Sequence, residues 1–351
     1  MTGPLVLGLD AGGTGSRAVV ADLHGRVLGT ARGEGANPVA HGGAAAARAV
    51  GDTLRAALDG LDPGAVAAGV VGLAGALVAE PELAGLWPAL GLSVTPRTTS
   101  DLALAYTAGT GRPDGSVLIG GTGAVAAEVR GHVPVRLADG HGWLLGDLGS
   151  GQWLGREAVR LALAAVDAGR TPSGTAAAVA EALCGRSGGD GLRAALLGAV
   201  YAEAPVRLAR LAPLVLDGAA AGEPVAQALV REAAGLLLGT LGTVRPAGSA
   251  LPVVLAGGVL SAGSPLAAAV RDGVAERWPA AEILPAGSTA GAAAWLAART
   301  LTGPAAAEEL HRALVAAQGP GGPGNAEGPP LPRGAFDRLC AARDSNPGPA
   351  D

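Results

Sequence analysis

The chain has 351 residues, a hydrophobic content of 49% and a formal net charge of −5, and it is long enough for two domains that each bury a core. It contains no lysine and no basic block, which excludes nucleic acid and anionic membrane surfaces as expected partners. Charged residues interrupt its alanine-rich stretches before they reach the roughly 20 residues that span a membrane, so no membrane segment is expected.

The first glycine-rich motif lies near the N-terminus. The apolar run from Leu5 to Asp10 predicts a buried strand that ends in a carboxylate. Gly12–Gly15 then predicts a tight turn into a second strand over 17–22. A polar turn over 23–25 leads to a third strand over 26–28. The rest of this half predicts a helix over 42–58, a strand over 65–73, a helix over 81–90 and a strand over 93–100. A loop at 108–115 predicts a hinge between domains.

The same plan recurs at Gly120–Gly123. An apolar strand over 117–119 precedes this motif, and strands over 124–129 and 133–135 follow it. Glycines let backbone N–H groups converge on phosphate oxygens, and threonine adds a hydroxyl donor. A plain tight hairpin is the alternative for either copy alone. The repetition favours two related half-domains that face one phosphate-bearing ligand.

Two common nucleotide motifs do not fit these residues. A dinucleotide fingerprint needs its glycines to open a helix, whereas these glycines open a strand. A Walker-type loop needs a lysine, and the chain has none. Charge compensation at the phosphates is therefore expected from backbone amides, arginine or Mg²⁺.

Helical patterns dominate the C-terminal half. The expected helices begin near Gln152 and continue over 175–183, 192–201, 206–214, 224–241, 264–278 and 288–299. An apolar strand over 253–256 runs into Gly257 and Gly258. The last helix can cross back to the first domain. Residues 319–351, rich in proline and glycine, are expected to be largely disordered.

Cysteine content and the N-terminus bear on the compartment. Cys184 and Cys340 are far apart, which indicates neither a disulfide framework nor a cysteine-rich metal site. Met1–Pro4 lacks the basic region of a signal peptide. Both features predict a cytoplasmic protein.

Six short motifs resemble, in order, those of the N-acetylglucosamine kinase and BadF/BadG/BcrA/BcrD ATPase family, within the superfamily of actin, hexokinase and the heat-shock ATPases. They are Leu7–Thr14, Gly35–Pro38, Ser100–Asp101, Gly120–Gly123, Gly142–Asp147 and Gly149–Ser150. The resemblance implies an α/β, two-domain actin-like ATPase (ribonuclease H-like) fold with an interdomain cleft. The domains are expected at 1–111 and 112–300.

The resemblance implies phosphoryl transfer from ATP. One phosphate loop would be Gly12, Gly13 and Thr14, the other Gly121, Thr122 and Gly123, with Gly257 and Gly258 under the adenosine. Asp10 would hold Mg²⁺ through water. Such a site is adequate because phosphoryl transfer needs positioning and charge neutralisation more than covalent help. A simple strand-to-helix turn is the alternative for Gly257 and Gly258.

Acceptor chemistry is expected at Asp101. The resemblance implies that its carboxylate takes the proton of a sugar hydroxyl as general base, whereas the residues alone favour an N-cap for the following helix. Both roles can hold together. The resemblance also implies that Asn37 and Asp147 bind sugar hydroxyls through paired hydrogen bonds. Each has a plain alternative as a turn residue. His141, Gly142 and Trp143 would form the adjoining wall, with an exposed turn histidine as the alternative for His141.

Departures from the family pattern concern the sugar side. Ala124 and Val125 replace a polar pair, and Leu148 replaces a glutamate. From the resemblance as a whole we expect an ATP-dependent kinase of an amino sugar, first N-acetylglucosamine or glucosamine, giving the 6-phosphate. A partner-activating ATPase and a non-catalytic sugar-binding protein are the alternatives. The resemblance also allows a homodimer.

Overall fold

The computed structural model describes residues 3–13, 15–38, 42–74 and 83–316. Its strands form two five-stranded sheets. The strands are β1 (Leu5–Ala11), β2 (Gly15–Asp22), β3 (Val27–Glu34), β4 (Val66–Leu73), β5 (Arg97–Ser100), β6 (Gly115–Gly120), β7 (Ala124–Arg130), β8 (Val133–Asp139), β9 (Val253–Ala256) and β10 (Ile283–Pro285).

The two sheets have the same topology. The N-terminal sheet has the order β3-β2-β1-β4-β5, and the C-terminal sheet has the order β8-β7-β6-β9-β10, so each follows the pattern 3-2-1-4-5. In each sheet the first three strands are antiparallel and the last two run parallel to the first. The duplication predicted from the two glycine motifs is therefore confirmed at the level of strand order.

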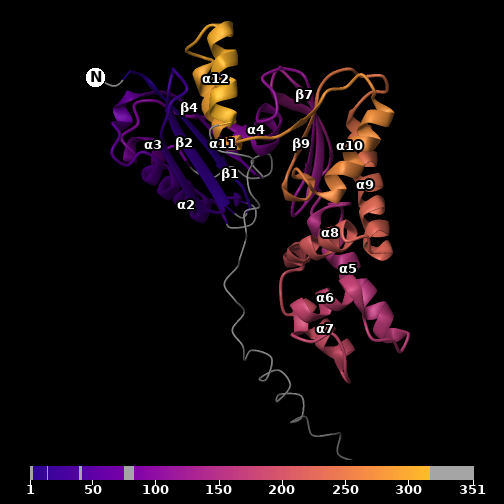
Figure 1. Cartoon of the computed structure of the whole chain (residues 1–351). Coiled ribbons are helices and arrows are strands. Elements are labelled where there is room, and N and C mark those ends of the chain that lie inside the picture. The colour runs from indigo at the N-terminus through magenta and orange to yellow at the C-terminus, as the bar shows by residue number, and fades with distance from the viewer. Residues whose placement is uncertain (1–2, 14, 39–41, 75–82, 317–351) are drawn as a thin grey trace, which may run out of the picture.

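Helices cover both sheets (Figure 1). They are α2 (Gly43–Ala57), α3 (Leu86–Ala89), α4 (Asp101–Thr107), α5 (Gly151–Asp167), α6 (Gly174–Cys184), α7 (Leu192–Tyr201), α8 (Ala212–Ala220), α9 (Pro224–Val244), α10 (Pro265–Arg277), α11 (Thr289–Ala298) and α12 (Pro304–Ala316), with 3₁₀ turns η1 (Pro63–Ala65), η2 (Pro205–Leu211) and η3 (Gly258–Leu260).

Side chains of β1 point alternately to the two faces of the sheet, and different helices cover these faces. Its odd-numbered apolar residues join the core formed with α2 and α3, whereas Val6 lies in a second core with α11 and α12. Gly8 and Asp10 share the face of Val6. A Cβ at Gly8 would lie 2.2 Å from the backbone nitrogen of Ala294 in α11. Glycine in this apolar strand therefore lets α11 pack directly on the sheet.

Helix α4 lies between the two sheets. Its residues Leu102, Ala105 and Tyr106 form a core with β6, β7 and β9, and it also contacts β1, β4 and β5. The chain passes between the sheets twice, after α4 and again after β10. The two passages meet, because the N–H of Gly287 donates to the carbonyl of Ala108 at 2.8 Å.

Several predicted elements differ from the structure at their ends. The strand expected over 93–100 is only β5, and the helix expected over 81–90 is only the short α3, with residues 81 and 82 outside the described residues. The helix expected over 206–214 is wrong in type: η2 is a 3₁₀ turn that precedes α8. Strand β10 and helix α12 were not predicted. The predicted tail over 319–351 lies outside the described residues.

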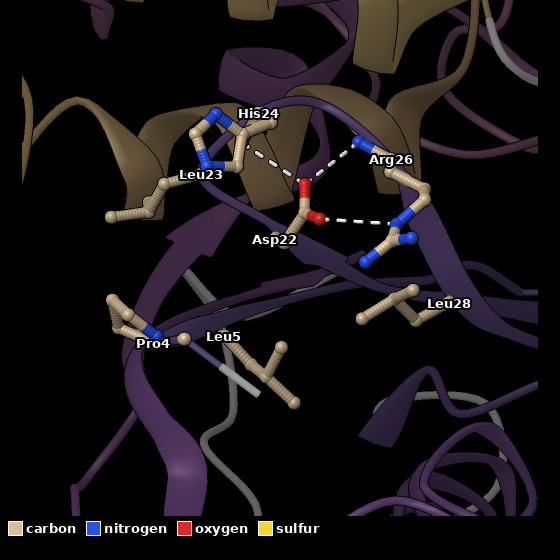
Figure 2. Close-up of a pocket in the computed structure, with 8 residues that line it drawn as sticks. Pro4, Leu5, Asp22, Leu23, His24, Arg26 and Leu28 are labelled. Atoms are coloured by element: carbon tan, nitrogen blue, oxygen red, sulfur yellow. Dashed lines mark hydrogen bonds and ion pairs between the residues drawn. The ribbon is translucent and has the colours of Figure 1, made fainter. Parts of the chain in front are cut away.

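No helix among the described residues is long and apolar enough to cross a membrane. A small pocket of about 270 Å³ lies where β1 begins and β2 ends (Figure 2). Its polar groups satisfy one another: the Asp22 carboxylate accepts the backbone N–H groups of His24 and Arg26 and the Arg26 side chain. Burial raises the pKa of Asp22, but these bonds and the Arg26 charge outweigh it and lower that pKa overall. The polar groups of the pocket therefore stabilise the turn between β2 and β3, and we assign no ligand to it.

Candidate active site

Asp10 is the last residue but one of β1 and lies on the face that meets α11. Its Oδ2 accepts a hydrogen bond from the Thr289 hydroxyl at 2.5 Å. Burial raises the pKa of Asp10 above its ordinary value, although the Thr289 bond and the charge of Arg17 act in the opposite direction. The structure therefore holds a desolvated carboxylate that a cation would stabilise.

The first glycine turn follows directly. The N–H of Gly12 donates to the carbonyl of Gly15, and the carbonyl of Gly12 accepts the N–H of Ala36 at 3.0 Å. Asn37, beside Ala36, is half-buried. A backbone hydrogen bond thus joins the turn to the segment that carries Asn37. Thr14 lies outside the described residues.

Asp101 is the first residue of α4, and the prediction that it could be the N-cap is wrong. Ser100 is the cap: its hydroxyl accepts the N–H of Ala103 at 3.2 Å. The Asp101 carboxylate instead accepts the N–H of Leu102 at 2.9 Å. Burial and then the charge of Asp10 raise the pKa of Asp101 to about 6, against the opposing effect of the backbone N–H groups. The pKa of this carboxylate lies close to neutral pH, which suits a general base.

The second glycine turn rests on the start of α5. The N–H of Gly121 donates to the carbonyl of Gly123, while the carbonyls of Gly121 and Thr122 accept the N–H groups of Gly151 and Gln152 at 2.8 and 3.1 Å. The first turn of a long helix therefore supports the loop from behind. Gln152 is buried there.

Gly257 touches the same loop from β9. Its φ is +94°, and a Cβ at this position would lie 2.3 Å from the carbonyl oxygen of Gly120. Only glycine permits both this conformation and this approach. A Cβ at Gly258 would meet open space. The structure thus brings Gly257, predicted for the adenosine, against the second glycine turn.

Asp147 also contacts the second glycine turn. Its Oδ1 accepts the N–H of Ala124 at 2.9 Å, and a Cβ at Gly123 would lie 2.5 Å from that same oxygen. Burial raises the pKa of Asp147, and the charge of Asp139 adds to this, whereas the Ala124 bond opposes it. Part of its hydrogen-bonding capacity therefore serves the loop itself.

Asp139 was not predicted, yet it shapes the segment around Asp147. Its two carboxylate oxygens accept the N–H groups of Asp147 and Leu148 at 2.7 and 2.9 Å. Asp147 itself has a left-handed φ of +56°. His141 is exposed, as its plain reading predicted, and Trp143 is 41% exposed. Gly142, with φ of +81°, makes the turn between them.

The predicted residues therefore form two groups. Asp10, Gly12, Gly13, Asn37 and Asp101 belong to the N-terminal sheet and its edge. Gly121–Gly123, Asp147, Gly257 and Gly258 belong to the C-terminal sheet. Helix α4, which carries Asp101, contacts strands of both sheets. Thr289 is the residue of the first group that sequence reasoning missed, since only the return of α11 to β1 brings it to Asp10.

Two sheets of one topology, each with a glycine turn after its first strand, define the two-domain α/β fold of the actin-like ATPases. The family model of the BadF/BadG/BcrA/BcrD ATPase family matches residues 7–295. The chain belongs to this family, and ATP is the nucleotide that membership implies.

Solved structures agree with this fold. A protein from Chromobacterium violaceum, provisionally named an N-acetylglucosamine kinase, has 29% identity and a TM-score of 0.67 over 84% of this chain and 99% of its own. A similarly named protein from Porphyromonas gingivalis has 19% identity and a TM-score of 0.61 over 88% and 98%. A ROK family glucokinase from Streptomyces griseus, solved with glucose and AMPPNP, has 22% identity and a TM-score of 0.52 over 84% and 99%. No curated protein matches the chain.

Proposed function

We propose that the protein is an ATP-dependent kinase of an amino sugar, with N-acetylglucosamine or glucosamine as acceptor and the 6-phosphate as product. The observation that carries this proposal is Asp101, a carboxylate with a pKa of about 6 at the start of the helix between the two sheets. The similarity to the Chromobacterium violaceum protein supports the acceptor class.

In this reaction Asp101 accepts one proton, that of the sugar hydroxyl. The oxygen of the sugar hydroxyl attacks the γ-phosphorus of ATP, the bond to the β-phosphate oxygen breaks, and ADP leaves. The hydroxyl proton passes to the Asp101 carboxylate. A general base is most effective when its pKa lies near the working pH, and Asp101 meets that condition.

The second glycine turn and Gly257 would hold the nucleotide. Gly257 packs backbone to backbone against Gly120, so this part of the chain presents main-chain groups rather than side chains. Backbone N–H groups at such turns suit phosphate oxygens. In a chain without lysine they are a principal source of charge compensation.

The donor set fits Mg²⁺. Asp10 offers the carboxylate oxygen that this ion prefers, and its raised pKa marks a charge whose burial outweighs the compensation by Thr289 and Arg17. Among the described residues no group of three or more candidate side chains could enclose a metal. This suits an ion that keeps several waters and binds mainly through substrate phosphates. Bound there, Mg²⁺ would neutralise phosphate charge.

Asn37 and Asp147 would bind sugar hydroxyls, beside His141, Gly142 and Trp143. The half-buried Asn37 is joined to the first glycine turn through Ala36, and Asp147 to the second through Ala124. We place the reaction in the cytoplasm, where ATP is available, and a homodimer stays a prediction.

The test is ADP release with Mg-ATP against a panel of hexoses and amino sugars, beside a control without sugar. The proposal expects stimulation by N-acetylglucosamine or glucosamine and a matching sugar 6-phosphate. Stimulation only by glucose would reject the amino-sugar acceptor. Hydrolysis that no sugar stimulates would reject the kinase and favour a partner-activating ATPase.

A further inference from the structure

Thr289 makes a contact that the expected site residues do not explain. Its hydroxyl donates to Asp10 Oδ2 at 2.5 Å, across 279 positions of sequence. Helix capping does not require this hydroxyl, because Ser288 is the N-cap of α11 and its own oxygen accepts the N–H of Gly291 at 3.0 Å. The Thr289 side chain is therefore available to serve Asp10.

The helix that carries Thr289 has little freedom to move relative to β1. A Cβ at Gly8 would lie within 2.3 Å of two backbone atoms of α11, and a Cβ at Gly291 would lie 2.1 Å from the carbonyl oxygen of Leu314 in α12. Both close approaches fix α11 between β1 and α12. Thr289 thus reaches Asp10 from a rigid support, which is what a precisely oriented site group needs.

The segment just before Thr289 is fixed as well. The N–H of Gly287 donates to Ala108 at the end of α4, and the N–H of Ser288 donates to Val315 near the end of α12 at 3.1 Å. The start of α11 is therefore held on three sides, by β1, by α4 and by α12. Thr289 therefore meets Asp10 where these three elements come together.

We propose that Thr289 is a positioning residue whose hydroxyl orients the Asp10 carboxylate toward the divalent cation of a bound nucleotide. The inference rests on the proposed function only in assigning a metal–nucleotide complex to Asp10. An unrestrained carboxylate can rotate about χ2, and this terminal torsion is broad. A hydrogen bond to one oxygen restricts that rotation and fixes the direction of the other.

Binding measurements test the proposal without turnover. Thr289→Val keeps the shape and removes the hydroxyl, whereas Thr289→Ser keeps the hydroxyl. Manganese serves as the spectroscopic probe: electron paramagnetic resonance gives the affinity for Mn²⁺ in the presence of ADP, and calorimetry gives the affinity for ADP without metal. We expect Thr289→Val to weaken Mn²⁺–ADP binding about tenfold, the effect of losing roughly 1.4 kcal/mol, and to leave metal-free ADP binding unchanged. Thr289→Ser should restore the wild-type affinity.

A control and a second pair of variants separate positioning from stability. Thr300→Val removes a hydroxyl that bonds Ala297 at the other end of the same helix, and it should leave Mn²⁺–ADP affinity unchanged. In an Asp10→Asn background, Thr289→Ala should add no further loss of Mn²⁺–ADP affinity, because the two residues act through one contact. This cycle also decides the matter if Thr289→Val fails to fold.

Three results would overturn the proposal. One is wild-type Mn²⁺–ADP affinity in Thr289→Val with only a lower melting temperature, which assigns a purely structural role. Another is equal loss in the valine and serine variants. The third is a wild-type protein that does not bind Mn²⁺–ADP. A wild-type protein that binds Mn²⁺–ADP but phosphorylates no sugar would reject the proposed function and leave the Thr289 comparison valid.

Discussion

The two glycine turns share a sequence and a topology but differ in where their carboxylates lie. Aligned on Gly-Gly-Thr-Gly, Asp10 of the first unit corresponds to Leu118 of the second, which is fully buried in the core. The first turn therefore has a carboxylate two residues before it and Asp101 nearby. The second has an apolar strand before it and the bare backbone of Gly257 against it, and its carboxylate, Asp147, comes from a later loop and bonds the turn itself.

A repeated unit can therefore serve two purposes, acceptor chemistry at one turn and nucleotide binding at the other. Two desolvated carboxylates, of which Asp10 raises the pKa of Asp101, suit a metal ion and an acceptor hydroxyl. A turn packed against glycine backbone suits phosphate oxygens and a flat base. The repeat supplies the frame, and the residues around each turn decide its chemistry.

Asp101→Asn removes the proton acceptor and keeps the size of the side chain. We expect kcat for sugar phosphorylation to fall by about 10²- to 10⁴-fold, the usual contribution of a general base. ATP affinity should stay close to wild type, because Asp101 is assigned to the acceptor. Steady-state kinetics and calorimetry check both values, and a variant with wild-type turnover would refute the assignment.

The pH dependence of the wild-type enzyme should report the same residue. Because the pKa of Asp101 is about 6, kcat should fall about tenfold per pH unit below that value as the base becomes protonated. Stability should follow the opposite trend. The folded state holds this proton more tightly than the unfolded state, so stability contributed by protonated Asp101 is full below about 4 and is lost as pH rises through 6.

Asp101→Asn should therefore unfold at a higher temperature than wild type at pH 7.5, with a smaller difference at pH 4. Thermal melts at the two values give the comparison. A variant less stable than wild type at pH 7.5 would show that the Leu102 N–H bond outweighs the desolvated charge.

Gly257→Ala tests the backbone cradle of the second unit. The new Cβ would meet the carbonyl oxygen of Gly120 at 2.3 Å, and alanine disfavours a φ of +94°. We expect KM for ATP to rise about tenfold and stability to fall by about 1–3 kcal/mol. Gly239→Ala, an exposed position inside α9 with open space around it, is the matched control and should be neutral or slightly stabilising. Unchanged ATP kinetics in Gly257→Ala would contradict the cradle.

Thr122→Ala removes one hydroxyl donor from the second turn while its backbone stays supported by Gln152. The expected effect is a rise of a few-fold in KM for ATP, the loss of about one hydrogen bond. KM for the sugar should not change. A selective rise in the sugar KM would move the second turn to the acceptor side.

Sequence reasoning identified the local parts of this molecule and the return of the last helix to the first domain, but not the contact that this return brings to Asp10. Both glycine turns, their flanking strands and α7 follow from apolar runs and turn residues, which act over a few positions. Thr289 could not be connected to Asp10 because its role depends on α11 returning to β1 across the whole second sheet. The signal was present in Gly8, since a glycine inside an apolar strand marks a close backbone approach.

Other errors have similarly physical causes. Asp101 and Ser100 are both good caps, and only the backbone geometry shows that Ser100 has the role. Residues 205–211 have a helical pattern, yet they form a 3₁₀ turn against α5. Asp139 gave no signal, because its task is to bind main-chain N–H groups of a loop eight and nine residues later.

The packing of α11 and α12 on the first sheet has a consequence for biosynthesis. One face of β1 and β4 is covered by residues 290–314, which leave the ribosome after the whole C-terminal sheet has been made. The segment between the two passages, about 112–286, can complete its own core during synthesis. The first sheet, although made first, must wait with an open apolar face. Chaperone dependence of the nascent chain should therefore end only when α11 and α12 emerge.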